Sequence, residues 1–191
     1  MAKQGTSLDV TWRHFLLDQV NSKEGPEWKI WEQPEDRQGK GMLAQRAGEA
    51  ARKQGREAFE EYHLALLVAR HGPEGRRISL NEKGPLLEVA REAGLDARKL
   101  ERDMADSALL EIIGNDHTEA VRQYGVFGTP TFVFESGQAA YLKMFVPPPE
   151  DTISLFMDFT GLMSGRPYLG EVKRPQPPWP KGAVRPPGPS R

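Results

Sequence analysis

The sequence predicts an α/β protein in which a block of helices separates one strand from a later β-hairpin. Three observations predict this class. Residues 8–16 alternate between apolar and polar side chains, as a half-buried strand does. From Met42 to Tyr124 apolar residues recur at helical spacing. A Gly-Thr-Pro turn at 128–130 then leads into two apolar runs separated by a short polar turn, the pattern of a β-hairpin.

The composition is that of a globular protein. The chain has 191 residues, of which 38% are hydrophobic, and 26 basic against 27 acidic residues give a net charge of −1. This balance predicts neither nucleic acid nor a membrane surface as a partner. No segment reaches the ~20 apolar residues of a membrane span. No secretion signal follows Met1, so we expect a cytoplasmic protein.

The chain contains no cysteine, which excludes disulfides, thiolate catalysis and thiolate-bound zinc from its own residues. Its four histidines lack the spacing of a metal site, so we predict no metal ligand. We expect His14 to pack within the first strand, with substrate contact as the alternative, and His63 to lie on a helix face. Asp116 and His117 are expected to be solvated.

The first predicted strand, over 8–16, is rich in β-branched and aromatic residues. A loop is predicted over 17–40, where Gly25-Pro26 marks a turn. Trp28 and Trp31 interrupt this polar loop. We predict that the two tryptophans pin the loop to the body of the protein, and a role facing a substrate is the alternative.

Residues that typically begin or end a helix mark the ends of the helices in this block. We predict helices over 42–54, 56–70, 85–93, 97–106 and 107–124. Pro85 suits the first turn of the third helix, and Gly94 closes it. Asp96 is the predicted N-cap of the fourth helix, because its carboxylate can accept from the free N–H groups of the first turn.

The rest of the chain contains the hairpin, one helix and a proline-rich tail. The predicted strands are 131–134 and 139–145, and the predicted helix is 150–163. The tail from 165 onward is expected to be extended or disordered because of its many prolines. We expect it to lie over the domain through Tyr168 and Trp179, and an SH3-type ligand is the alternative.

Four passages in this order carry a family resemblance: residues 10–21, residues 62–70, Ala90–Asp96 and residues 125–134. Together they resemble the DsbA-like branch of the thioredoxin superfamily, which includes FrnE-type disulfide oxidoreductases and 2-hydroxychromene-2-carboxylate isomerases. The resemblance covers about residues 8–165. It implies a thioredoxin-like (DsbA-type) fold with an all-helical insertion, N-terminally incomplete.

In that family a Cys-x-x-Cys motif follows the first strand, and residues 2–5 here resemble the end of the helix after it. The resemblance therefore implies that the first strand and the cysteine motif are missing. Two explanations remain open, a fragment of a longer protein and a cysteine-free relative. The implied division is 1–40 for the visible strand and loop, 41–124 for the helical insertion, 125–164 for the cis-proline loop, hairpin and last helix, and 165–191 for the tail.

The resemblance implies that the complete protein is a thiol–disulfide oxidoreductase and that this chain is redox-inactive, with no catalytic residue. Phe127, Gly128, Thr129 and Pro130 would form the substrate-binding wall, with a cis bond before Pro130 and a trans bond as the alternative. The implied partners are protein thiols or disulfides, or a small thiol such as glutathione, and no other cofactor is expected. A glutathione-dependent isomerase or transferase and a non-catalytic peptide-binding module stay open as other functions.

Overall fold

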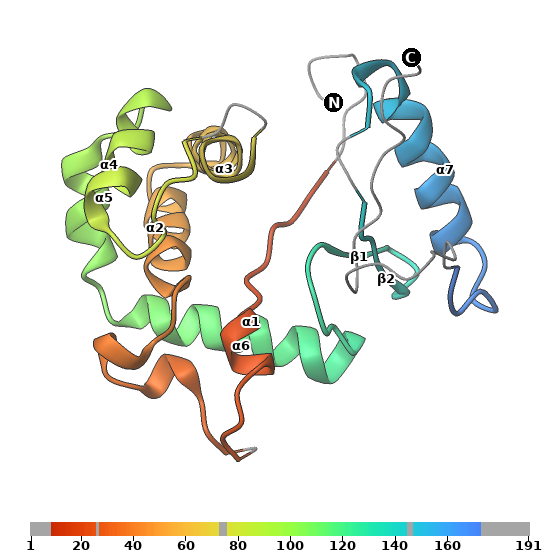
Figure 1. Cartoon of the computed structure of the whole chain (residues 1–191), viewed down its shortest axis with the longest axis horizontal. Helices are drawn as coiled ribbons and strands as arrows, with labels where there is room; N and C mark the ends of the chain where they lie inside the picture. The colour runs from red at the N-terminus through yellow and green to blue at the C-terminus, as the bar shows by residue number, and fades with distance from the viewer. Residues whose placement is uncertain (1–8, 26, 73–75, 145–146, 173–191) are drawn as a thin grey trace, which may run out of the picture. The chain divides into compact units, whose positions relative to one another are not determined.

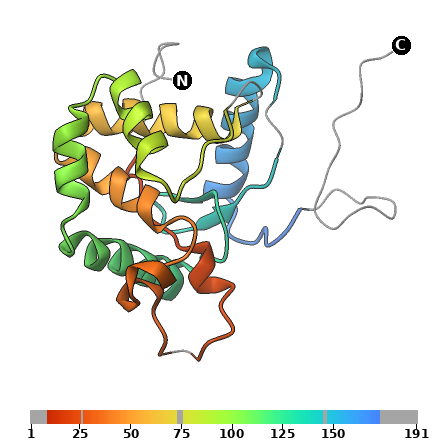
Figure 2. The same cartoon turned by 60° about the vertical axis from the view of Figure 1, so that its left-hand side comes forward.

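The computed structural model describes residues 9–25, 27–72, 76–144 and 147–172. This part of the chain is mostly helical with one small two-stranded sheet, which agrees with the predicted fold class (Figures 1 and 2). The chain divides into two compact units. Trp12–Glu119 form the helical unit, and Met1–Thr11 with Ala120–Arg191 form the hairpin unit.

The larger apolar core lies inside the helical unit. Four helices surround it: α2 (Met42–Arg52), α3 (Arg56–His71), α4 (Lys83–Glu92) and α5 (Ala97–Met104). Helix α2 contacts α3 and α5, and α4 contacts the same two helices. Tyr62, Leu86 and Leu100 are fully buried at their centre. Each helix is therefore held mainly by the burial of its apolar face.

The turn between α4 and α5 follows the predicted signals. Gly94 has a φ of +81°, in the left-handed region that glycine adopts without a steric penalty. Asp96 caps α5, since its Oδ1 accepts a hydrogen bond of 2.9 Å from the Lys99 N–H. The predicted cap of this helix is thus confirmed.

A second apolar cluster lies between helix α6 (Ala108–Tyr124) and the chain that precedes α2. Trp28 and Trp31 pack against it, which confirms that the two tryptophans pin their loop to the body of the protein. Its buried members are Leu16, Ile30, Met42 and Ile113. The loop itself is less irregular than predicted, because it contains the short turns α1 (Leu17–Val20), η2 (Ile30–Glu32) and η3 (Glu35–Arg37).

The predicted strand over 8–16 is wrong for the described residues, which have no strand before β1. Side chains of the helices take the place of a neighbouring strand. The His14 N–H donates to Asp116 Oδ2 at 3.0 Å, and the Leu16 N–H donates to His117 Nδ1 at 3.2 Å. Residues 14–16 are also buried in succession, which breaks the alternation that a two-faced strand requires.

The hairpin unit contains β1 (Thr131–Val133) and β2 (Ala139–Tyr141), paired antiparallel with Phe132 opposite Ala140. Helix α7 (Thr152–Ser164), preceded by the turn η4 (Pro149–Asp151), covers one face of the hairpin. The Phe132 and Phe159 rings lie 5.1 Å apart between the sheet and α7.

Strand β2 is shorter than the predicted 139–145. Its last bond to the other strand runs from the Leu142 N–H to the Pro130 carbonyl at 3.1 Å. Proline has no N–H to return a bond, so the ladder ends there. Residue 145 lies outside the described residues.

The prediction that Tyr168 packs onto the domain is wrong, because its side chain is 82% exposed. Trp179, the tail from 173 onward and the expected helix end at 2–5 lie outside the described residues. No helix within the described ranges is long and apolar enough to cross a membrane.

Helix α6 approaches Trp31 so closely that only glycine fits at position 114. A Cβ on Gly114 would lie 2.6 Å from Trp31 Cδ1, whereas a Cβ on Gly48 of α2 would meet His14 Cε1 at an ordinary 3.7 Å. We expect Gly114→Ala to lower the free energy of unfolding by about 1–3 kcal/mol through overpacking. Urea denaturation followed by circular dichroism measures this change.

The matched control is Gly48→Ala, which lies in a helix of the same unit. Alanine favours a helix interior over glycine by about 1 kcal/mol, so this variant should be as stable as the parent chain or more stable. Equal effects of the two substitutions would show that Trp31 does not restrict position 114.

Candidate functional site

The predicted substrate-binding loop lies at the surface between α6 and β1. Phe127 is 65% exposed, Thr129 and Pro130 are exposed, and Gly128 is buried. The bond between Thr129 and Pro130 is cis, as predicted. The loop therefore presents an aromatic ring and the Thr129–Pro130 peptide to solvent.

The end of α6 sets where this loop begins. Gly125 has a φ of +63°, and the N–H of Val126 donates to the carbonyl of Ala120 at 3.1 Å. The Gly125 N–H also donates to the Val121 carbonyl at 3.1 Å, which is the bond of an αL motif with glycine just after the helix end. These contacts end the helix at Tyr124.

The hairpin sets the shape of the rest of the loop. Thr131 Oγ1 donates to the Gly128 carbonyl at 2.7 Å. The Phe127 and Tyr141 rings lie 5.0 Å apart, and a Cβ on Gly128 would approach Tyr141 Cε2 to 3.1 Å. The glycine at 128 thus lets the loop lie directly against the Tyr141 ring of β2.

The Thr129 backbone is not used in the hydrogen bonds of the hairpin. Within the described ranges, its N–H and its carbonyl have no hydrogen-bond partner. A backbone amide at a surface can pair with another extended chain. Of the four predicted residues, Phe127, Thr129 and Pro130 are exposed and Gly128 is buried, and the chain has no cysteine that could act as a nucleophile beside them.

Sequence reasoning missed a buried polar cluster in the helical unit. This His14 cluster consists of His14, Gln45, Glu49, Arg52 and His63. The His14 ring bonds Gln45 Oε1 through Nδ1 and Glu49 Oε1 through Nε2, the second at 2.6 Å. Arg52 Nε also donates to Glu49 Oε1 at 2.6 Å. His14 is thus buried, as its predicted packing role requires, but through polar contacts.

Charges within the His14 cluster oppose the effect of burial on Glu49. Burial acts to raise the pKa of Glu49, but hydrogen bonds and charge from His14 and Arg52 outweigh it and hold that pKa below its ordinary value. Arg52 also lies over the Phe59 ring, 3.7 Å from its centroid, and donates to the Trp12 carbonyl at 2.6 Å. One guanidinium thereby joins α2, α3 and the segment before α1.

His63 lies on α3 against two aromatic rings. Its ring is 4.4 Å from that of Trp12 and stacks on Phe59 at 5.5 Å. Its Nε2 is buried and has no partner among the described atoms. Burial lowers the pKa of His63, and the charges of Arg52 and His14 lower it further. The prediction that His63 lies on a helix face was therefore incomplete, because it did not include these contacts or the burial of Nε2.

The expectation that Asp116 and His117 are solvated is wrong, since both are buried. They bind the backbone of residues 14–16, and Arg13 Nη1 donates to Asp116 Oδ1 at 2.6 Å. Burial lowers the pKa of His117. The sequence contained a signal for this, because Leu109, Ile113 and His117 recur at a spacing of one helical turn.

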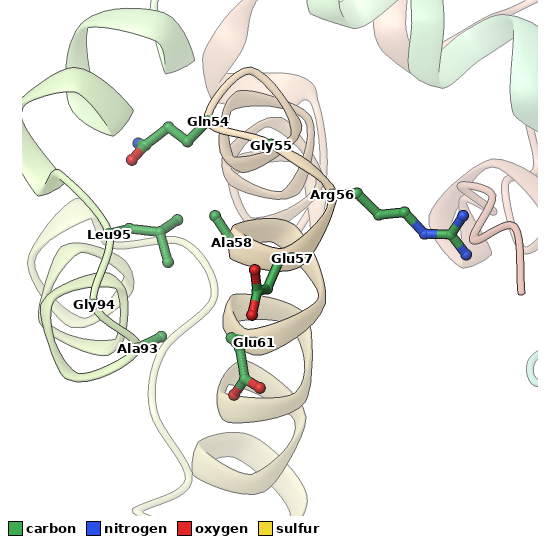
Figure 3. A pocket seen from close by; sticks show the side chains of 9 residues that line it. All are labelled: Gln54, Gly55, Arg56, Glu57, Ala58, Glu61, Ala93, Gly94 and Leu95. Carbon is green, nitrogen blue, oxygen red and sulfur yellow. The ribbon is translucent and has the colours of Figure 1, made fainter. Parts of the chain in front are cut away.

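The described surface also has an open depression of about 570 Å³ at the start of α3 (Figure 3). Glu57 and Glu61 are its exposed acidic side chains, and Arg56 points away from it. The lining residues include neither a histidine nor a hydroxyl: Gln54, Gly55, Arg56, Glu57, Ala58, Glu61, Ala93, Gly94 and Leu95. No three side chains of metal-binding type come together within the described residues.

Acid should destabilise the helical unit through His63. A histidine whose folded-state pKa is depressed binds fewer protons when folded, so its contribution to stability is lost as pH falls below the ordinary value of 6.5. We expect His63→Leu to flatten the loss of stability between about pH 7.5 and about pH 5. Urea denaturation at several pH values measures this slope.

His71→Leu is the control, because His71 is exposed at the end of the same helix. That variant should keep the slope of the parent chain. An unchanged slope in His63→Leu would mean that another group governs the acid sensitivity.

Comparison with known proteins identifies the family of this chain. The sequence model of the DSBA-like thioredoxin domain matches residues 1–151 of the 191 residues. The match includes the helices α1 to α6, the Phe127–Pro130 loop and both strands. A comparison with curated proteins gives no match. Because the matched range covers most of the sequence, the chain belongs to the family of DSBA-like thioredoxin domains.

Proposed function

We propose that this chain binds an extended polypeptide at the Phe127–Pro130 loop. In this way it holds the polypeptide for a thiol–disulfide reaction. The observation that carries the proposal is the exposed residue Thr129, whose backbone has no hydrogen-bond partner within the described ranges, beside the exposed Phe127. Membership of the DSBA-like family supports the reaction class. The residues of this sequence hold the polypeptide, and none of them supplies a thiolate.

Each loop residue has a separate part in the proposed binding. The N–H and carbonyl of Thr129 pair with the backbone of the polypeptide. This pairing requires an extended partner but does not depend on the partner's side chains. The Phe127 ring contacts one apolar side chain of the polypeptide. Gly128 keeps the loop against Tyr141, so the binding groups are fixed before the partner arrives.

The charge of the loop favours a polypeptide over glutathione. Val126–Phe134 contains neither a basic nor an acidic residue. Glutathione carries two carboxylates, and recognition of a carboxylate usually involves a cation such as arginine. An extended polypeptide needs only backbone pairing and apolar contact, both of which the loop offers.

Removing the Phe127 ring should weaken binding without unfolding the chain. Burial of a phenylalanine side chain contributes about 1.5–3 kcal/mol, so Phe127→Ser should raise the Kd for an extended, uncharged model peptide by tenfold or more. Fluorescence anisotropy of a labelled peptide measures Kd. Because the ring is 65% exposed, the unfolding midpoint should change little.

Tyr168→Ser is the control for this measurement. It removes another exposed aromatic ring of the same unit, outside the loop, and should leave Kd unchanged. Equal binding by the parent chain and Phe127→Ser would count against the loop as the binding site.

The chain alone should not catalyse disulfide reduction. In an insulin-reduction assay with dithiothreitol, turbidity should develop at the rate of the protein-free control, because the sequence has no cysteine to attack the disulfide. A rate of turbidity that increases with the concentration of the chain would contradict the proposal that the chain binds the polypeptide but does not itself reduce disulfides.

A further inference from the structure

We propose that two copies of the chain pair through the exposed face of α3, with the two helices antiparallel and Leu64, Leu67 and Val68 of each copy at the centre. This face belongs to the helical unit. The pairing is therefore separate from the Phe127–Pro130 loop and does not depend on peptide binding there.

Helix α3 exposes a row of large apolar side chains. Leu64 is 54% exposed, Leu67 is 42% exposed and Val68 is 64% exposed. Residues three and four positions apart share one side of a helix, so these three side chains form a continuous ridge. Tyr62 and Ala69 of the same helix are buried in the core of the unit. A helix on the surface of a globular protein normally has one apolar face, whereas α3 has a second one that faces solvent.

Charged groups lie at the two ends of this ridge. Glu57 and Glu61 are exposed two turns and one turn before Leu64, and Figure 3 shows them next to each other along α3. They have no ion-pair partner within the described ranges. His71 is exposed at the other end, as the last residue of the helix. The face is thus acidic at its start, apolar in its middle and cationic at its end when His71 is protonated.

A twofold axis at the level of Leu66 makes this face complementary to itself. Leu64 and Val68 lie two residues on either side of that level, so each meets the other in the second copy. Glu61 and His71 lie five residues on either side, so they also meet across the interface. Every contact occurs twice, as in any twofold interface. The antiparallel order also places the N-terminus of each helix beside the C-terminus of the other, which the helix dipoles favour.

The order of the charges selects a second copy as the occupant and fixes its direction. A parallel pair would place Glu57 and Glu61 against the same residues of the second copy, and like charges in contact oppose association. The two carboxylates also oppose binding to an anionic lipid surface. Because each copy contributes only three large apolar side chains, we expect a weak dimer that forms as the protein concentration rises.

Leu64→Ser tests the apolar centre, with the dimer Kd measured by sedimentation equilibrium. Loss of one buried leucine side chain should raise this Kd by about tenfold or more. Ile112→Ser is the matched control, because Ile112 is an exposed apolar residue of α6 in the same unit, and it should leave the Kd unchanged. Circular dichroism checks that both variants keep their helices. A parent chain that stays monomeric, or equal effects of the two substitutions, would overturn the proposal.

Exchange of the two charges tests the register. At about pH 6, where an exposed histidine is mostly protonated, Glu61→Lys and His71→Glu should each weaken the dimer, because each places like charges opposite one another. The variant with both substitutions restores opposite charges and should recover the Kd of the parent chain. A double variant as weak as the single ones would overturn the antiparallel register.

The lack of cysteine allows a direct test of the arrangement, because one introduced cysteine is then the only thiol. With a rise of about 1.5 Å per residue, the two copies of residue 67 lie about 3 Å apart along the helix axes and those of residue 57 about 27 Å apart. A short thiol-reactive crosslinker should therefore join Leu67→Cys into dimers but not Glu57→Cys. Equal crosslinking of the two variants, or none of Leu67→Cys where the parent chain is dimeric, would overturn the pairing.

Dilution separates this pairing from the other measurements. Well below the Kd of the dimer the chain is a monomer, so the pH dependence of unfolding then reports on His63 and not on the contact between Glu61 and His71. Leu64→Ser should bind the model peptide like the parent chain, because the loop lies outside the helical unit. A loss of peptide binding in this variant would contradict the separation of the two surfaces.

Discussion

The helical unit depends on an extended segment whose backbone is held by side chains. Asp116 and His117 of α6 accept the N–H groups of His14 and Leu16, and Arg52 of α2 donates to the Trp12 carbonyl. A buried backbone group without a partner is costly, so these contacts are what allow the segment to enter the core. They also explain why ionisable residues lie in positions where helical spacing predicts apolar ones.

Local signals predicted most of the helices and the hairpin. Asp96 and Gly94 act through the first and last turns of their own helices, so the sequence around them contained the information needed. The role of Phe127–Pro130 stays a prediction that follows from the family resemblance, and only its cis bond before Pro130 is confirmed. The spacing of Leu109, Ile113 and His117 would have placed His117 on the buried side of α6, but the prediction of a solvated His117 did not use it.

The errors come from contacts between residues far apart in sequence. The alternation over 8–16 is typical of a strand, yet a strand requires a neighbour, and a single segment cannot reveal whether one exists. The His14 cluster was missed for the same reason, because His14, Glu49 and His63 come from different parts of the chain. Their mutual distances follow from the packing of the segment before α1 against α2 and α3, which no local pattern encodes.

Pro130 has a consequence for solubility that is separate from binding. The stretch Val126–Phe134 has no charge and contains several aromatic and β-branched residues, a composition that favours cross-β stacking when about six such residues run uninterrupted. Gly128 and Pro130 interrupt the run, and Glu135 ends it with a charge. The same proline that shapes the surface loop therefore also acts as a gatekeeper, because it leaves too short a segment to nucleate a fibril.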